Sequence, residues 1–259
     1  MSFEGLLACA CMLLGSSAFA QTVQPVISEY PMKADGKFAL TNGTLTPMVV
    51  VLEPKSFSIT PDGQGVFRSL DHDIHVDLSA MSARIEPGQT YYVFYKARAD
   101  QLPAWFTIYS TFSSARHNPG LDVRIMLPHT VYLYQKHPLN KEEINLPPAT
   151  WNSGTKTIVC DVENHGTSLV RVQEVRISGP HASETTAGFP LLPLGRRHLE
   201  FSWEEKQPPE SLQLRFEHFT LKAPCRRCIW CGRHPRESTE RGLDAYPQRV
   251  RIENERRAA

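Results

Sequence analysis

The sequence predicts an all-β protein built from two β-sandwich domains in tandem, of which the second is the smaller. Three observations support this class. After Gln21, short runs rich in β-branched and aromatic residues alternate with turn signals, and almost no run has helical periodicity. About seven such runs fall within roughly 110 residues, the strand density of an immunoglobulin-like sandwich. A charged segment with three prolines, residues 137–149, then precedes a second series of runs and is predicted to be a linker.

The first domain, residues 21–136, is predicted to be a succession of strands with short connections. The strands are expected within residues 37–42, 46–54, 56–65, 72–79, 83–97, 102–113 and 121–136. Pro61-Asp62-Gly63 and Glu86-Pro87-Gly88 are predicted turns, because proline presets φ and glycine accepts positive φ.

The second domain, residues 150–223, has a similar but shorter pattern. Its strands are expected within residues 155–164, 167–179, 189–195, 197–203 and 211–223. Asn164-His165-Gly166 is a predicted hairpin turn between the first two. Residues 224–259 form an irregular Arg-rich and Cys-bearing tail. It is predicted to be disordered, or to be cross-linked separately from the two domains.

The amino terminus, residues 1–20, has the pattern of a secretory signal peptide. An apolar stretch from Leu6 to Leu14 precedes Ala18-Phe19-Ala20, which matches an A-x-A cleavage site. The apolar stretch is too short to span a bilayer, and no other segment has that length, so we expect no stable membrane insertion. The predicted location is therefore the periplasm.

The charge is low and unevenly distributed. The chain has a formal net charge of +1. From Gln21 to Ala223 there are 19 Lys and Arg against 21 Asp and Glu, whereas the tail has 9 Arg against 5 acids. A nearly neutral body argues against nucleic acid as a partner.

The cysteines do not form an obvious disulfide framework. Two of the six leave with the signal peptide, and Cys160 stands alone within a predicted strand, where a small buried apolar role is expected. The tail carries four residues with metal-binding chemistry: Cys225, Cys228, Cys231 and His234. All four lie in one ten-residue segment, whereas structural zinc sites usually join two separated pairs, so we predict no metal and no cofactor; a local or intermolecular disulfide is the alternative.

Other motifs carry little chemistry. Asp71, Asp73 and His75 would share one face of a strand, which is best interpreted as a solvated face. Asn42-Gly43-Thr44 matches the glycosylation acceptor pattern, which often occurs by chance. The sequence has no G-x-S-x-G nucleophile motif and no glycine-rich phosphate loop, so a binding module is expected rather than an enzyme.

The most specific feature is the strand at residues 121–136. Every second residue at its start is apolar: Leu121, Val123, Ile125 and Leu127. Pro128 favours a sheet edge, because proline cannot donate a ladder hydrogen bond. An apolar edge strand invites pairing with another chain. The alternative is an interior strand whose four side chains face the core of their own domain.

The motifs before and within this strand resemble the amino-terminal domain of periplasmic pilus-assembly chaperones, the PapD-like family. Ile85-Glu86-Pro87-Gly88 matches the family's turn, and Leu102-Pro103 precedes the aromatic strand Trp105–Tyr109. Tyr134-Gln135-Lys136-His137-Pro138 resembles the end of the family's last strand. The resemblance covers about residues 25–222 and is weaker in the second domain, where residues 157–179 are similar to a family hairpin.

The resemblance implies a non-enzymatic chaperone that donates an edge strand to a secreted pilus or fimbrial subunit, with an outer-membrane usher as a further partner. It implies that Leu121, Val123, Ile125 and Leu127 contact the client strand. The family's Arg and Lys anchors for a client carboxylate fall near residues 28–30 and 130–131, which contain neither residue type. Lys33 and His129 are the nearest candidates for this contact.

Two other functions remain open from the sequence. An immunoglobulin-like surface or adhesion module that binds a cell-envelope component would expose Trp105 and Tyr109 together. An accessory domain of an enzyme would require a pocket with a perturbed acid or histidine cluster. Self-association, in which a second copy covers the apolar strand, is a further expectation of an unpaired edge.

Overall fold

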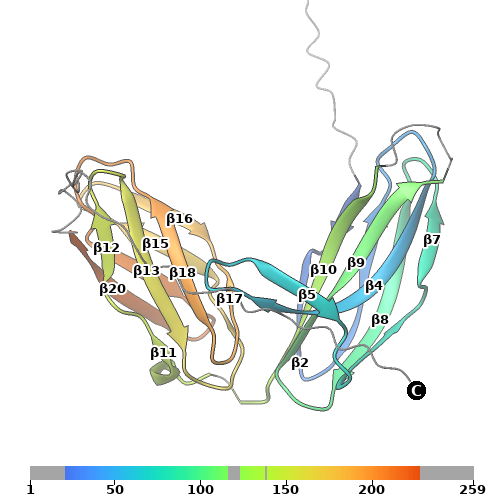
Figure 1. Ribbon diagram of the computed structural model, residues 1–259, viewed down its shortest axis with the longest axis horizontal. Helices are drawn as coiled ribbons and strands as arrows, with labels where there is room; N and C mark the ends of the chain where they lie inside the picture. The colour runs from blue at the N-terminus through green and yellow to red at the C-terminus, as the bar shows by residue number, and fades with distance from the viewer. Residues whose placement is uncertain (1–20, 116–122, 138, 228–259) are drawn as a thin grey trace, which may run out of the picture.

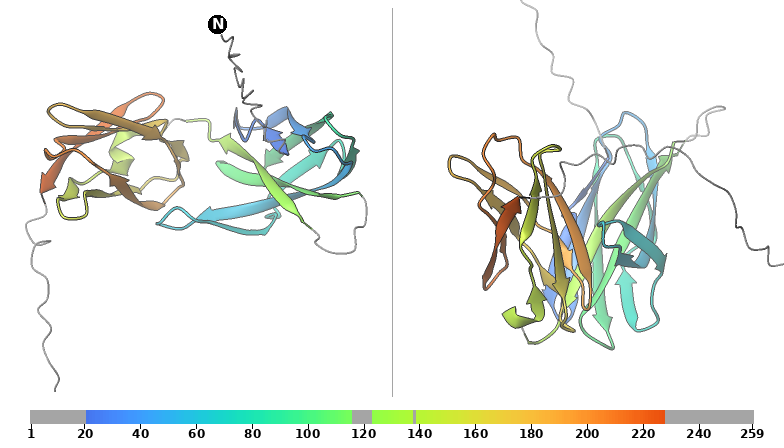
Figure 2. Two further views of the ribbon diagram at one scale, coloured as in Figure 1. Left: turned by 90° about the horizontal axis from the view of Figure 1, so that it is seen from above. Right: turned by 60° about the vertical axis from the view of Figure 1, so that its left-hand side comes forward.

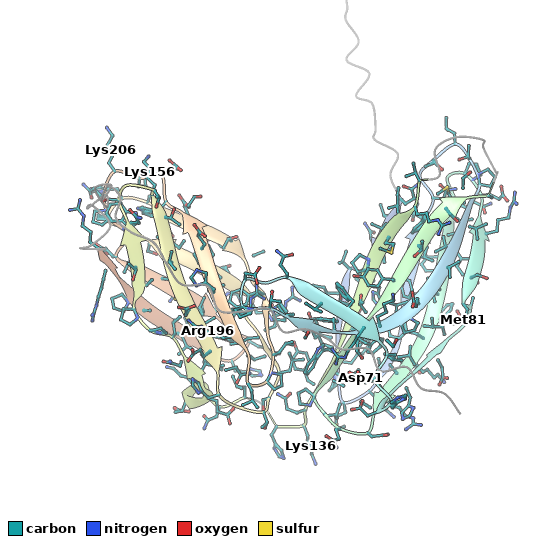
Figure 3. The ribbon with its side chains drawn as sticks, viewed as in Figure 1. Asp71, Met81, Lys136, Lys156, Arg196 and Lys206 are labelled. Carbon is teal, nitrogen blue, oxygen red and sulfur yellow. The ribbon has the colours of Figure 1, made fainter. Side chains whose placement is uncertain are left out.

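The structure confirms an all-β chain with two sandwich domains (Figure 1). This computed structural model describes residues 21–115, 123–137 and 139–227. The two domains stand side by side and join at one end, so that together they form a V (Figure 1). Lys136 lies in the connection at the base of this V (Figure 3).

The first domain contains two facing sheets. The four-stranded sheet has the order β1 (Thr22–Gln24), β3 (Ala34–Thr41), β8 (Thr90–Ala99), β6 (Ile74–Leu78), with all neighbours antiparallel. The second sheet has the order β2 (Ile27–Pro31), β10 (Ile125–Tyr134), β9 (Ala104–Ser114), β4 (Met48–Ile59), β5 (Gly65–Ser69). The short strand β7 (Ser82–Ile85) also pairs with β4.

Alternation along the strands builds the core between these sheets. On β8, Val93 and Tyr95 are buried while Tyr92 and Phe94 between and beside them are exposed. The fully buried apolar side chains of the second sheet follow the same period of two. They include Val50, Leu52, Phe106, Ile108, Phe112, Val131 and Leu133. The predicted turn at residues 61–63 is confirmed: it joins β4 to β5, and Gly63 has φ of +90°.

The second domain wraps its strands around a separate core. One sheet has the order β11 (Ile144–Asn145), β13 (Thr157–Asn164), β12 (Ala149–Asn152), β20 (Thr220–Arg227), β19 (Ser211–Arg215), β15 (Glu174–Ser178), β16 (Ser183–Ala187). Strand β18 (Arg196–Ser202) pairs with β13, and β14 (Val170–Arg171) pairs with β17 (Pro190–Leu191). A short 3-10 helix, η1 (Lys141–Glu143), precedes β11. Cys160 is 3% exposed, which confirms its predicted role as a small buried residue.

The boundaries of the second domain differ from those predicted. The proposed linker, residues 137–149, contains η1 and β11, and β12 begins at its last residue. This segment belongs to the second domain, because Ile144 pairs with Asn164 and is buried in the second core. The predicted tail begins four residues too early, since β20 continues to Arg227 and Cys225 pairs with Ala149. The predicted hairpin at residues 164–166 is also wrong, because β13 pairs with β18 rather than with the next strand along the chain.

The two domains share a buried apolar cluster. It consists of Phe57, Tyr132 and Leu169, with five partly buried neighbours that include Trp105 and Leu192. The β4–β5 hairpin extends from the first domain toward the second (Figure 2), and the carbonyl oxygen of Pro61 accepts a hydrogen bond from the backbone N–H of His198 at 2.7 Å. The interface thus fixes the carboxyl half of β10 against the second domain.

Candidate docking edge

Strand β10 has a complete neighbour on one side and a partial neighbour on the other. It pairs with β9 from Ile125 to Leu133, but with the parallel strand β2 only from Thr130 to Tyr134. Within the described part of the chain, no strand pairs with Ile125–His129 on the side opposite β9. We call this side of Ile125–His129 the open edge.

The apolar row that begins at Val123, two residues before β10, and continues along β10 passes from solvent into the core. Val123 is 53% exposed, and Ile125 and Leu127 are partly buried against the core. Val131 and Leu133 continue the same row and are completely buried. Leu121, the fourth predicted client contact, lies outside the described residues. The row is therefore neither wholly enclosed by its own domain nor wholly free.

His129 marks the boundary between these two halves of the row. It is completely buried, and its Nδ1 lies 2.7 Å from the carbonyl oxygen of Pro25, just before β2. Because a carbonyl oxygen only accepts, Nδ1 donates, and Nε2 accepts from the hydroxyl of Tyr95 at 3.0 Å. The ring of Phe38 stacks on the imidazole at 4.5 Å between centroids. Both ring nitrogens of His129 therefore have partners inside the domain, so in this structure neither is offered to a client carboxylate.

Acid is expected to destabilise the first domain through His129. Burial lowers the pKa of this histidine below 6.5. As the pH falls through 6.5 toward the lower folded-state pKa, the unfolded chain binds a proton before the folded chain does, so the free energy of unfolding decreases. Urea unfolding between about pH 7.5 and about pH 5 measures this loss, since carboxylates titrate mainly below that range.

His129→Gln is the matched control for that pH dependence, because glutamine can both donate and accept but does not titrate. We expect the variant to lose stability less steeply than the wild type over the same pH range. An unchanged slope in His129→Gln would show that the dependence comes from other groups.

Lys33, the other predicted carboxylate contact, is exposed at the far end of β2. It follows Met32, whose backbone N–H donates to the carbonyl oxygen of Tyr134 at the last residue of β10. The structure therefore does not bring Lys33 to the open edge, which begins at the opposite end of the strand.

The segment 28–30, where the resemblance placed a basic client anchor, carries an acidic residue with an internal partner. Glu29 lies on β2 opposite Tyr132, within residues 28–30. Its carboxylate accepts a hydrogen bond at 2.9 Å from the guanidinium of Arg171 in the second domain. Sequence reasoning missed this pair, because nothing in the local pattern links residues so far apart.

The pair borders a cavity of about 550 Å³ between the domains. Its lining combines polar and charged residues with apolar and aromatic ones, which include Tyr134, Leu139, Leu169, Phe216 and Phe219. Burial, followed by the negative charge of Glu29, raises the pKa of the Tyr134 phenol, which stays neutral. The cavity therefore has a mixed lining: besides the Glu29–Arg171 ion pair it includes the charged residues Lys136 and Glu217.

The candidate metal ligands are only partly described. Cys225 is partly buried in β20, and burial raises the pKa of its thiol to about 11, while Cys228, Cys231 and His234 lie outside the described residues. Among the described residues, no three His, Cys, Asp or Glu side chains gather as a metal site. The predicted shared face of Asp71, Asp73 and His75 is wrong, because β6 begins at Ile74 and the first two precede it in a turn.

Trp105 and Tyr109 do not form the exposed pair that an adhesion surface would require. Trp105 is partly buried beside the interdomain cluster, and its indole N–H donates to the carbonyl oxygen of Phe57 at 2.7 Å. Tyr109 is also partly buried and packs edge-on against Phe67, at 5.0 Å between ring centroids. In the described ranges, no helix is both long and apolar enough for a membrane span.

Comparison with known proteins gives similarities of structure but not of sequence. No family model matches the sequence, and no curated protein does. The class 5 fimbriae chaperone CfaA is similar at 9% identity and a TM-score of 0.47, with 80% of this chain and 99% of that chain covered. The E. coli chaperone DraB is similar at 10% identity and a TM-score of 0.46, covering 80% and 97%.

The CupB2 chaperone of Pseudomonas aeruginosa is similar at 13% identity and a TM-score of 0.45, covering 79% of this chain and 100% of that chain. At these identities the likeness concerns the fold alone. In its fold, the chain is similar to fimbrial chaperones over about four-fifths of its length.

Proposed function

We propose that this protein is a non-enzymatic assembly chaperone of the periplasm that binds a secreted pilus or fimbrial subunit by strand addition at the open edge. One observation carries the proposal: β10 acquires its second neighbour only at Thr130, while the apolar row before it reaches solvent at Val123. Backbone groups and apolar side chains are thus offered together on one strand.

The physical basis is that a client sandwich lacking one strand can be completed by a strand from another protein. Such a client has unpaired backbone groups along a groove and an uncovered core, and an added strand supplies partners for both. Burying the row Val123, Ile125 and Leu127 would contribute several kcal/mol at about 25 cal/mol per Å² of apolar area. Much of that gain offsets the loss of translational and rotational freedom on association.

The proposed docking does not use a client carboxylate at the family's usual place. Glu29 occupies that region of β2, and a second carboxylate beside it would meet like charge. Arg171 is already paired with Glu29. We infer that the strand edge, rather than a charged anchor, supplies most of the affinity for the client.

Val123→Asp is expected to weaken client capture by on the order of 100-fold, because a carboxylate would enter an apolar groove without a partner. The tagged protein would be purified from the periplasm of a strain that expresses fimbriae, and the co-purifying subunit identified by mass spectrometry and titrated. Val51→Asp is the matched control, since Val51 is 50% exposed on β4 and lies two strands away from the open edge.

Capture of a pilus-type subunit by the wild type and Val51→Asp, with loss in Val123→Asp, supports the proposal. Equal capture by all three proteins would contradict docking along the row. Thermal unfolding of each variant shows whether a loss reflects misfolding. The adhesion alternative gains nothing from the partly buried Trp105 and Tyr109.

A further inference from the structure

The open edge has an asymmetric set of hydrogen-bonding groups. The N–H of Thr130 donates to the carbonyl oxygen of Val26 at 2.8 Å, and the carbonyl oxygen of Tyr134 accepts from Met32 at 3.1 Å. Even-numbered residues of β10 therefore direct both backbone groups toward β2, since residues alternate between the two sides of a strand. By the same alternation, Met126 and Pro128 direct their backbone groups to the open edge.

Pro128 removes one donor from this edge without breaking the sheet. Its backbone nitrogen faces away from β9, so the β9–β10 ladder remains intact across the Pro128–Tyr109 pair. Between Ile125 and His129, the open edge consequently offers one donor, the N–H of Met126, and two acceptors, the carbonyl oxygens of Met126 and Pro128. A strand that pairs across Pro128 must leave one of its own carbonyl oxygens without a ladder partner.

We propose that Pro128 is a specificity residue that favours a foreign strand over a second copy of this chain. A foreign strand with all its N–H groups loses one hydrogen bond when it pairs across Pro128. Two copies of β10 bring two prolines, so pairing that spans both loses two hydrogen bonds. Pro128 therefore weakens self-association twice as much, in free energy, as it weakens client capture.

This inference deepens the proposed function, because it rests on the open edge as the docking site, but its central test requires no client. Three associations are compared by sedimentation over a range of concentrations: wild type with itself, wild type with Pro128→Ala, and Pro128→Ala with itself. Each restored N–H is expected to raise the association constant about 2- to 12-fold, so Pro128→Ala should associate with itself about 4- to 144-fold more strongly than the wild type does.

A second variant tests the backbone origin of that gain. Met126→Pro in the Pro128→Ala background removes the other donor of the edge, while the β9 ladder loses nothing. Association should return toward the wild-type value. Circular dichroism and thermal unfolding verify that each variant is folded.

The client measurement separates the two proposals. With the subunit captured as described above, Pro128→Ala should bind it about 2- to 12-fold more tightly, a single step. If self-association rises stepwise and no subunit is captured, the role of Pro128 stands and the proposed chaperone function fails. If Pro128→Ala leaves self-association unchanged, the role of Pro128 is overturned, whatever the client result.

Discussion

Asn42→Ala and Asn164→Ala are each expected to lower the free energy of unfolding of their own domain by about 2 to 4 kcal/mol. Asn42 is completely buried at the end of β3, and its amide donates to the carbonyl oxygens of Thr46 at 2.8 Å and Ile85 at 3.0 Å. Its own side-chain oxygen accepts from the N–H of Thr44 at 3.0 Å. Alanine would leave these backbone groups buried without partners.

Asn164 occupies the equivalent place at the end of β13. It is 2% exposed, donates to the carbonyl oxygens of Ser168 at 2.8 Å and Leu192 at 3.0 Å, and accepts from the N–H of Gly166 at 3.0 Å. In both domains the amide therefore closes the loop after a strand and ties it to a distant segment. The two domains use one device, although no repeat is evident in the sequence.

Urea unfolding of each variant measures the expected loss. Asn145→Ala is the matched control, because Asn145 is exposed and its side chain makes a single hydrogen bond to Glu163 at 3.3 Å. A change within about 0.5 kcal/mol is expected for this surface variant. Similar values for all three variants would contradict a structural role for the buried amides.

The same asparagines show where sequence reasoning succeeds and where it stops. From the sequence, Asn42-Gly43-Thr44 is recognisable only as a glycosylation pattern, and Asn164-His165-Gly166 as a predicted turn. The first matches a glycosylation pattern, yet its amide is buried and donates twice within the domain. The second ends a strand, but not as a hairpin. Local chemistry predicts that the chain turns, whereas the partner of the next strand depends on long-range packing.

Some features of the candidate site can likewise be predicted from the sequence, and others cannot. Alternation predicts that Val123, Ile125 and Leu127 share one face, and Pro128 predicts a sheet edge. Periodicity cannot predict that the pairing of β2 with β10 begins only at Thr130, because a strand's pattern reports its faces and not its neighbours. Between β1 and β2 the chain passes from one sheet of the first domain to the other, and this brings Pro25 into contact with the buried His129. No local sequence pattern specifies that path.

Leu169→Ala is expected to lower the free energy of unfolding by about 2 to 5 kcal/mol, and to separate one unfolding transition into two. Leu169 belongs to the second domain and is 1% exposed, packed with Phe57 and Tyr132 of the first. Its N–H donates to the side-chain oxygen of Gln135 at 3.1 Å, and its carbonyl oxygen accepts from the same amide at 3.1 Å. Truncation leaves a cavity in the shared cluster, so the domains lose their main apolar coupling.

Differential scanning calorimetry measures both the loss and the number of transitions, and Leu45→Ala, at an 86% exposed leucine, is the control. A single unshifted transition in Leu169→Ala would contradict coupling through this cluster.

The interdomain cluster also affects docking, because it includes a residue of β10. Tyr132 is in the cluster and pairs with Glu29 of β2, so the interface also holds the closed half of β10 in place. Weakening it should let β2 separate from β10 more often, which extends the open edge beyond His129 and increases self-association of Leu169→Ala in sedimentation.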